Sequence, residues 1–542
     1  MQPAPSLMHL EPPAETQRAD VLLIILGLAS IALHLLCGGG YGYFRDELYA
    51  IACSKHLAWG YVDQPPLSEG ILAIVGKLLG YSQLALRLLP ALCGGVITFF
   101  VGRIARALGG GRFAQALAAV AYLAGGVYLA IDNYYSMNCF DHLFWIINIY
   151  LLVRILNGAD TRWWLLFGLV AGLGLENKYS MGFLGLGLIA GLTLTRARRH
   201  FLDKWLWVGG ALAVLLFLPH FLWEVRNHFP TAEFIHNVTL KKNLPLSPWG
   251  FFLQCVLLMN PTALPVWAAG LVYLLWDPPP KPVPGSAVTE MSATASAPAS
   301  LASGRRLRTL GWTFIGVLAI LLSTNSKPYY AAPAFLILLP AGAVAEERLL
   351  SRPHCNWLKP AYLVLLILGG ALFAPLVLPV LAPPTLARYQ TWLGIQVGSE
   401  ERGDSPRNLP QVLGDRLGWP ELTAQVAEIY HSLPPEEQAQ CVIGASNYGY
   451  AGAIDLFGPR YGLPNAISTH NNYWFWGPGS KPGAVLLVVG GSQRDYERLY
   501  ADVQPVATFT FPYAYISGTR IFLCRRPKMT LQEYWPTHHD FI

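Results

Sequence analysis

Long apolar runs separated by short polar loops fill most of the first 380 residues of the chain. Runs of this kind favour helices in the hydrocarbon layer of a membrane, which about 20 residues can cross. Eleven such helices are predicted, at residues 21–37, 84–101, 113–131, 140–153, 163–175, 179–195, 205–223, 249–276, 310–323, 331–344 and 361–381. The pattern therefore predicts a mainly α-helical protein that crosses a membrane about eleven times.

Basic residues decide whether 163–195 is one long crossing or two short ones. Arg154 and Arg162 precede this stretch, and Arg196, Arg198 and Arg199 follow it. Loops rich in Lys and Arg stay in the cytoplasm, so an even number of crossings must separate these two loops. Two short helices, or a re-entrant hairpin, are therefore predicted to turn at Glu176-Asn177-Lys178.

The same rule orients the whole chain with its N-terminus in the cytoplasm. The other loops assigned to the cytoplasm are all basic; they contain Arg103, Arg106, Arg112, Arg305, Arg306, Arg308, Arg348, Arg352 and Lys359. The loops assigned to the outer side hold most of the acids, namely Asp46, Glu47, Asp63, Glu69, Asp132, Asp141, Glu176, Glu224 and Glu233. Polar chemistry is therefore predicted on the outer side of the membrane.

Changes in composition divide the chain into parts. Residues 1–20 are predicted to be a cytoplasmic tail, and residues 21–382 a membrane domain with a large outer loop at 41–83. Within it, 278–304 is rich in Pro, Ala, Ser and Thr, which predicts a disordered cytoplasmic linker. Residues 383–542 read as a small α/β domain on the outer side. Its expected helices are 422–433, 449–457 and 494–501, and its expected strands are 441–445, 484–489, 506–511 and 520–523.

Composition supports this assignment. The chain is 53% hydrophobic and only 13% charged, whereas an ordinary soluble domain is about 25% charged, so a soluble cytosolic enzyme is excluded. The net charge is +6, but the Lys and Arg residues lie mainly between apolar runs rather than on one basic face. They therefore indicate the topology of the chain and no nucleic acid partner. The eight cysteines form no CxxC pair, so neither a metal knuckle nor a dense disulfide framework is indicated.

The first outer loop carries the residues best suited to chemistry. It contains Arg45-Asp46-Glu47 and Tyr49, followed by Asp63-Gln64. Adjacent carboxylates on a helix point about 100° apart, so one can act on a substrate while the other holds a neighbour such as Arg45. The alternative is that these acids are solvated or interact with a helix dipole.

Several motifs resemble family 39 glycosyltransferases, the GT-C group that includes protein O-mannosyltransferases and the aminoarabinose transferases of lipid A. The resemblance covers about residues 20 to 350. It rests on Asp46-Glu47-x-Tyr49, Pro65-Pro66-Leu67, Asp141, Lys178-Tyr179 and Lys327-Pro328-Tyr329-Tyr330, in this order. It implies a GT-C-like membrane enzyme that uses a polyprenyl-phosphate sugar as donor, with Asp46 as the catalytic base.

Chemistry agrees with this assignment. An inverting transfer from a sugar phosphate needs one base for the proton of the acceptor, and it needs positive charge at the leaving phosphate. An ionisable group at membrane depth should face a cavity or a partner, which favours Lys327 and Lys178; snorkelling to the interface is the alternative. The predicted catalytic residues are Asp46 and Glu47. The predicted phosphate-binding residues are Lys178, Lys241, Lys327, Tyr329 and Tyr330, with Arg45, Tyr49, Asp63, Gln64, Asp141, Glu233 and His236 in supporting roles.

Two details leave the donor site open. The aminoarabinose transferases have Glu-Lys before Pro-Pro, where this chain has Asp63-Gln64, so a phosphate-binding lysine is missing there. No cofactor is certain. Glu233 and His236 could bind a divalent cation together with Asp63, although an isolated Glu-x-x-His pair is common.

The sequence therefore predicts a hexosyl- or pentosyltransferase of the bacterial inner membrane, with its active site and its C-terminal domain in the periplasm. Its partners would be membrane lipids, a polyprenyl-phosphate sugar donor and a lipid, glycan or protein acceptor. Two alternatives remain. One is a lipid or solute transporter or flippase, against which stands the absence of inverted repeats in the hydropathy. The other is a receptor whose terminal domain binds a ligand.

Overall fold

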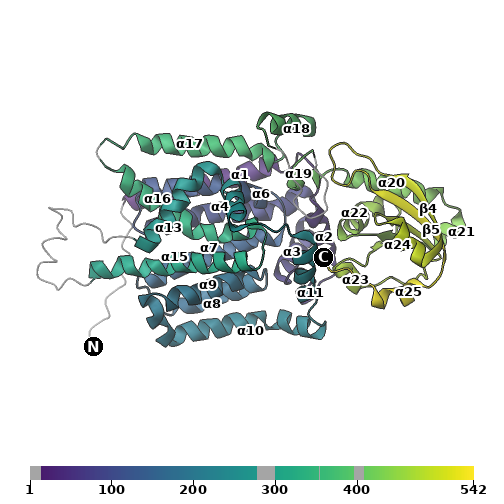
Figure 1. The fold of residues 1–542 in the computed structure, drawn as a ribbon, viewed down its shortest axis with the longest axis horizontal. Coiled ribbons are helices and arrows are strands. Elements are labelled where there is room, and N and C mark those ends of the chain that lie inside the picture. The colour runs from purple at the N-terminus through teal and green to yellow at the C-terminus, as the bar shows by residue number, and fades with distance from the viewer. Residues whose placement is uncertain (1–13, 277–298, 353, 396–407) are drawn as a thin grey trace, which may run out of the picture.

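The computed structural model describes residues 14–276, 299–352, 354–395 and 408–542. In Figure 1 a bundle of long helices fills one side of the molecule, and an α/β region lies at one end of the bundle. The helices α2 (Arg45–Lys55), α3 (Leu67–Leu79) and α11 (Pro230–Asn237) lie between these two parts (Figure 1). The first outer loop therefore lies where the helical bundle meets the α/β region.

The helices of the bundle follow the predicted apolar runs. They are α1 (Ala14–Cys37), α4 (Gln83–Ala107), α5 (Arg112–Leu123), α6 (Gly126–Ile131), α7 (Met137–Leu156), α8 (Trp163–Leu175), α9 (Ser180–Thr193), η1 (Arg196–Leu202), α10 (Lys204–Arg226), η2 (Val238–Lys242), α12 (Pro248–Leu258), η3 (Pro261–Ala263), α13 (Leu264–Trp276), α15 (Ala299–Ser323), η4 (Pro328–Ala331), α16 (Ala332–Leu350), α17 (Leu358–Phe373) and η5 (Ala374–Leu376). Among the described residues, six helices are long and apolar enough to cross a membrane, or up to eight if each of two bent pairs is one span. The predicted multi-pass, mainly helical membrane fold is confirmed.

Two predicted spans are interrupted. The prediction of one continuous helix over 249–276 is wrong, because α12 and the segment from η3 through α13 form an angle of 100°. Asn260 at the break has a positive φ of 72°, and Pro261 has no N–H to continue a helix. The run at 113–131 also breaks, between α5 and α6. The predicted turn at Glu176-Asn177-Lys178 is confirmed, since α8 ends at Leu175 and α9 begins at Ser180.

The loops predicted to be cytoplasmic contact one another. Arg103 forms an ion pair of 2.6 Å with Asp20, and Glu347 accepts hydrogen bonds from the backbone of Gly111 and Ala114. Thr195, which follows α9, lies 2.9 Å from Thr309 of α15. Of the predicted linker, residues 278–298 lie outside the described residues, and 299–304 form the first turns of α15.

A five-stranded sheet with the strand order β2-β1-β3-β5-β4 forms the centre of the α/β region. Its strands are β1 (Cys441–Ala445), β2 (Ala466–Ile467), β3 (Val485–Val489), β4 (Tyr500–Thr508) and β5 (Arg520–Pro527). Strand β1 is parallel to β2 and β3, whereas β5 is antiparallel to β3 and β4. The helices of this region are α18 (Pro383–Trp392), α19 (Gln411–Gly414), α20 (Trp419–Ser432), α21 (Pro435–Gln440), α22 (Tyr448–Phe457), η6 (Gly458–Tyr461), α23 (Asn472–Trp476), α24 (Gln493–Leu499), α25 (Leu531–Tyr534) and η7 (Trp535–Thr537).

The helix α2 belongs to the hydrophobic core of the α/β region. Leu48, Tyr49, Ala52 and Cys53 are buried in one cluster with side chains of α20, α22 and the sheet. A Cβ atom at Gly452 of α22 would lie only 2.9 Å from the backbone carbonyl of Leu48, so a larger residue there would force the helices apart. The first outer loop and the C-terminal region therefore fold as one packed unit.

Candidate functional site

Asp46 lies in the first turn of α2 with an accessible carboxylate. Its side chain is 44% exposed. The hydroxyl of Tyr448, the first residue of α22, donates a hydrogen bond of 2.9 Å to its Oδ1 atom. The guanidinium of Arg45 lies 3.8 Å from the same oxygen. Asp46 can therefore meet a substrate while one of its oxygens is held by the protein.

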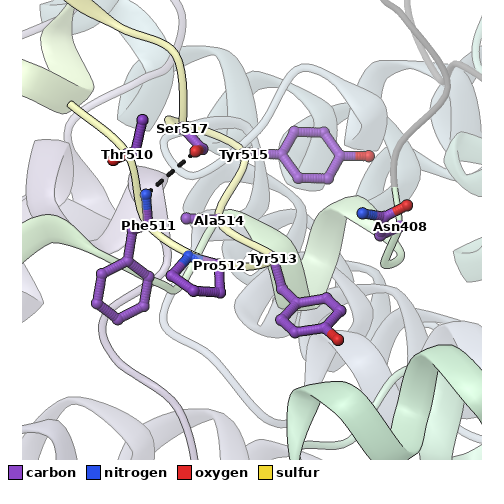
Figure 2. A pocket seen from close by; sticks show the side chains of 8 residues that line it. All are labelled: Asn408, Thr510, Phe511, Pro512, Tyr513, Ala514, Tyr515 and Ser517. Carbon is purple, nitrogen blue, oxygen red and sulfur yellow. Dashed lines mark hydrogen bonds between the residues drawn. The ribbon is translucent and has the colours of Figure 1, made fainter. Parts of the chain in front are cut away.

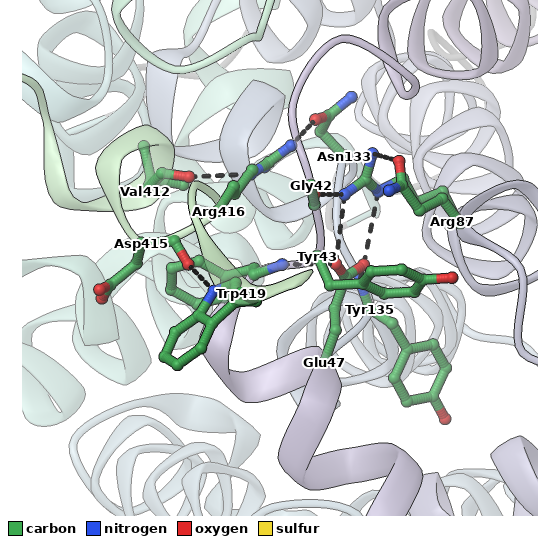
Figure 3. Close-up of polar contacts among 12 residues, drawn as sticks. Gly42, Tyr43, Glu47, Arg87, Asn133, Tyr135, Val412, Asp415, Arg416 and Trp419 are labelled. Atoms are coloured by element: carbon green, nitrogen blue, oxygen red, sulfur yellow. Dashed lines mark hydrogen bonds and ion pairs between the residues drawn. The ribbon is translucent and has the colours of Figure 1, made fainter. Parts of the chain in front are cut away.

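Glu47 is buried, and both oxygens of its carboxylate accept hydrogen bonds (Figure 3). Its carboxylate accepts hydrogen bonds from the side chain of Arg87 at 3.2 Å and from the backbone N–H groups of Phe44 at 2.8 Å and Tyr135 at 2.9 Å. Glu47 therefore pairs with Arg87 of α4 and not with Arg45, the partner that the sequence suggested. With no exposed surface, Glu47 supports the start of α2 rather than meeting a substrate.

The segment before α20 adds two charged residues that the sequence analysis did not identify. Arg416 is fully buried, and its Nη1 atom donates a hydrogen bond of 2.9 Å to Asn133, which lies between α6 and α7 (Figure 3). Asp415 lies 3.8 Å from the guanidinium of Arg45. No motif marks these two residues, because only folding brings them to α2.

Tyr49 and Asp63 form a second polar contact beside Asp46. The hydroxyl of Tyr49 donates a hydrogen bond of 3.0 Å to Asp63. Burial raises the pKa of the Asp63 carboxyl to about 7; the hydrogen bond from Tyr49 opposes this rise, and the nearby charge of Asp46 adds to it. Gln64, next to Asp63, donates a hydrogen bond to the buried Glu69. Gln64 therefore anchors the loop to α3.

Lys178 lies at the turn between α8 and α9, beside Asp141 of α7. Its ammonium donates a hydrogen bond of 2.6 Å to Asn138 and lies 3.7 Å from Asp141. It also lies 5.0 Å from the ring centre of Tyr330. Asp141 accepts a hydrogen bond from Ser180. The prediction placed Lys178 and Tyr330 in one site, and the structure brings these two side chains together.

Aromatic residues lie beside this cation. The rings of Tyr329 and Tyr330 are 4.6 Å apart, and Tyr329 is in electrostatic range of Tyr134 and Asp46. Burial, followed by the charge of Asp46, raises the pKa of Tyr134. Lys178, Tyr330 and Tyr329 are therefore in contact with one another, and the charge of Asp46 reaches Tyr134 and Tyr329.

The other predicted cations lie in different surroundings. Lys327 directly precedes η4, the turn that carries Tyr329 and Tyr330, and its side chain is half-buried. Lys241 is exposed. Its neighbour Lys242 is half-buried and close enough to Asp63 for its charge to lower the pKa of that carboxyl. Of Lys241 and Lys242, Lys242 is therefore the one whose charge acts on Asp63.

The predicted metal ligands are not brought together. Glu233 is exposed and lies 3.1 Å from the ring nitrogen of His539, while His236 is also exposed. Within residues 14–276, 299–352, 354–395 and 408–542, no group of three or more His, Cys, Asp or Glu side chains is placed to hold a metal ion. Asp63, which contacts Tyr49, lies in a different environment from these two residues.

A pocket of about 490 Å³ opens on the α/β region (Figure 2). Its walls come from the turn between β4 and β5 and from one residue ahead of α19; they are Asn408, Thr510, Phe511, Pro512, Tyr513, Ala514, Tyr515 and Ser517. None of the predicted site residues lines it. The group of Arg45, Asp46, Tyr49, Asp63 and Tyr448, called the Asp46 cluster below, is therefore the stronger candidate for catalysis.

Comparison with known sequences supports the resemblance inferred from the motifs. Residues 63–223 match the family described as dolichyl-phosphate-mannose-protein mannosyltransferase. A polyprenol-phosphate-mannose–protein mannosyltransferase of Corynebacterium glutamicum is 30% identical over 171 residues, which are 27% of this chain and 32% of that protein. The lipopolysaccharide core galacturonosyltransferase RgtB of Rhizobium johnstonii is 26% identical over 232 residues, 42% of this chain and 47% of that protein.

Solved structures show the same fold. The structure of ArnT from Cupriavidus metallidurans bound to undecaprenyl phosphate is similar with a TM-score of 0.54 and 18% identity, covering 94% of this chain and 98% of that chain. Its apo form gives a TM-score of 0.56 at 17% identity, with the same coverage. This likeness confirms the predicted GT-C-like fold. The resemblance to mannosyltransferases rests on the family and sequence matches above.

The sequence matches are partial. The chain matches about a third to a half of the length of the two curated relatives. The family match begins at Asp63, so it does not include Asp46 or Glu47. The roles of individual residues therefore rest on the geometry described above.

Proposed function

We propose that this chain is an integral membrane glycosyltransferase that moves a sugar from a polyprenyl-phosphate donor to an acceptor, with inversion at the anomeric carbon. The observation that carries the proposal is the position of Asp46. Its carboxylate is 44% exposed, it lies at the junction of the membrane bundle and the α/β region, and it accepts a hydrogen bond from Tyr448 of that region. The similarity to two sugar transferases and the GT-C-like fold support it.

The geometry suggests how the residues divide the work. Asp46 takes the proton of the acceptor hydroxyl as that oxygen attacks the anomeric carbon. The phosphate leaves from the opposite face of the sugar and gains negative charge as the bond breaks. A fixed cation stabilises this charge in a site from which water is excluded. Lys178, oriented by Asn138 and Asp141, and Lys327 beside η4 are the cations proposed for this role.

The distribution of charge supports an orientation. The basic loops contact one another, and the Asp46 cluster is shared with the α/β region, which Figure 1 shows at one end of the bundle. By the positive-inside rule the basic end faces the cytoplasm. We therefore place the active site and the α/β region in the periplasm of a bacterial inner membrane, where a lipid, a glycan or a protein is the acceptor.

Mass spectrometry of cells with and without the gene tests the proposal. The deletion strain should accumulate a polyprenyl-phosphate sugar and lose one sugar from an envelope lipid, glycan or protein. A strain carrying Asp46→Asn should show the same two changes, and re-expression of the natural gene should reverse them. If neither the polyprenyl lipids nor the envelope sugars differ between the strains, the proposal is wrong.

A further inference from the structure

Tyr448 reaches from the α/β region to the proposed base. It is the first residue of α22, directly after Asn447, whose side chain accepts hydrogen bonds from the backbone N–H groups of Gly449 and Tyr450. Its hydroxyl donates a hydrogen bond of 2.9 Å to Oδ1 of Asp46. Its ring stacks on that of Tyr49, with 4.5 Å between the ring centres. The side chain is therefore held both at its ring and at its hydroxyl.

The helix that carries Tyr448 has a rigid support. Strand β1, which precedes α22 in the chain, is buried along its whole length and lies between β2 and β3 in the sheet. Glycine at position 452 lets α22 approach the backbone of α2 at Leu48. Sites built on helices and strands are held more precisely than sites on loops. The phenol thus has a fixed place relative to α2.

The two oxygens of Asp46 differ in their surroundings. Oδ1 accepts the hydrogen bond from Tyr448 and lies 3.8 Å from the guanidinium of Arg45. Oδ2 receives no hydrogen bond from any residue in the described ranges. A general base must present one oxygen within hydrogen-bond reach of the proton that it takes. Because Oδ1 is held and the side chain is 44% exposed, Oδ2 is the oxygen left to take that proton.

We propose that Tyr448 is a positioning residue for Asp46 and that the C-terminal α/β region thereby completes the active site. This inference rests on the proposed glycosyltransferase function. It assigns the region a direct part in the chemical step, in addition to any part in binding the acceptor. The substitution Tyr448→Phe removes the hydroxyl and keeps the ring that stacks on Tyr49.

The natural enzyme and two variants, each in nanodiscs, test the proposal. A small misplacement of a catalytic group costs about 10²-fold in rate, so we expect Tyr448→Phe to lower kcat by roughly 10- to 100-fold. The KM for the donor and the affinity for undecaprenyl phosphate should stay within about twofold, because Tyr448 orients only the base. The assay donor is the polyprenyl-phosphate sugar that accumulates in the deletion strain.

The matched control is Tyr473→Phe. Tyr473 is likewise a tyrosine of the α/β region whose hydroxyl donates to a carboxylate, Asp455, at 2.8 Å. Both variants lose one hydrogen bond of the same kind, so both should lose a similar amount of thermal stability. Only Tyr448→Phe should lose kcat.

The possible outcomes separate this inference from the proposed function. If Tyr448→Phe turns over as fast as Tyr473→Phe while the natural enzyme is active, Tyr448 does not position the base. The inference also fails if Tyr448→Phe raises the donor KM and leaves kcat unchanged. If the natural enzyme transfers no sugar from any polyprenyl-phosphate donor, the proposed function itself is wrong.

Discussion

The guanidinium of Arg87 lies 3.2 Å from the carboxylate of Glu47, and both side chains are almost fully buried, at 2% and 0% exposure. Arg87 also donates a hydrogen bond of 2.7 Å to the carbonyl of Gly42. The pair ties the first turn of α2 to α4 (Figure 3). Glu47 therefore fixes the helix on which its neighbour Asp46 is presented.

We expect Glu47→Gln to destabilise the protein strongly. Breaking a buried ion pair leaves an uncompensated charge, which costs about 3–5 kcal/mol. Thermal unfolding in detergent measures this loss. The matched control is Glu437→Gln, because Glu437 and Arg525 form a 2.8 Å pair that is 28% exposed on both sides. Such a partly exposed pair is worth only about 0–1 kcal/mol, so equal losses in the two variants would contradict a structural role for Glu47.

Asp46→Asn should abolish transfer and leave the fold and donor binding intact. The amide keeps the size of the side chain and can still accept from Tyr448, but it cannot take the proton of the acceptor. Loss of a general base costs about 10²–10⁴-fold in rate. Turnover of the labelled donor in nanodiscs is compared with the natural enzyme, and donor binding is measured separately. Near-normal turnover in Asp46→Asn, with loss of turnover in Asp63→Asn or Asp141→Asn, would assign the base to another carboxylate.

Removing either proposed phosphate cation should weaken use of the donor. A hydrogen bond between charged groups contributes roughly 1.5–3 kcal/mol, which corresponds to about 10- to 100-fold in kcat/KM. We expect this loss for Lys178→Ala and for Lys327→Ala in steady-state kinetics with varied donor concentration. Lys241→Ala is the control, because its side chain is exposed. A larger loss in Lys241→Ala than in the other two variants would move the phosphate site toward η2.

The raised pKa of Asp63 predicts a dependence of stability on pH. Its pKa rises from the ordinary value of 3.8 to about 7 in the folded protein, chiefly because of burial. The folded state therefore holds this proton more tightly than the unfolded state between about pH 4 and pH 7. The stability contributed by protonated Asp63 is complete below pH 4 and is lost as pH rises through 7.

Asp63→Asn removes this titration. Melting temperatures of the two proteins, measured in one detergent from pH 4.5 to pH 8, should diverge as pH rises, with Asp63→Asn showing the smaller decline. Parallel curves would show that Asp63 keeps an ordinary pKa.

The topology predicts opposite sides for two points of the chain. A periplasmic reporter such as alkaline phosphatase should be inactive when fused at Ser296 and active after Ile542, because the sequence predicts eleven crossings between the N-terminal tail and the α/β region. A cytoplasmic reporter at the same two positions should give the reverse result. If both fusions reported the same side, the number of crossings would be wrong.

The apolar runs predicted the helical bundle well because a membrane imposes one simple requirement on sequence. Each crossing must satisfy its own backbone hydrogen bonds and expose apolar side chains. The interruption at Asn260-Pro261 was missed because the residues on both sides of it are apolar, as a straight crossing would require. Strand β1 was predicted with its observed ends, residues 441–445, since the sequence there is a short apolar run between polar segments.

The sequence alone determined that this protein is a polytopic membrane protein with a C-terminal α/β region, and it singled out Asp46, Lys178 and the tyrosines of η4. Local pattern suffices for such features, because hydropathy, charge and short motifs are properties of neighbouring residues. Only the tertiary structure decided that Glu47 pairs with Arg87 and that Tyr448 holds Asp46. Asp46 and Tyr448 are 402 positions apart, and no local pattern links residues that meet only when α22 packs on α2.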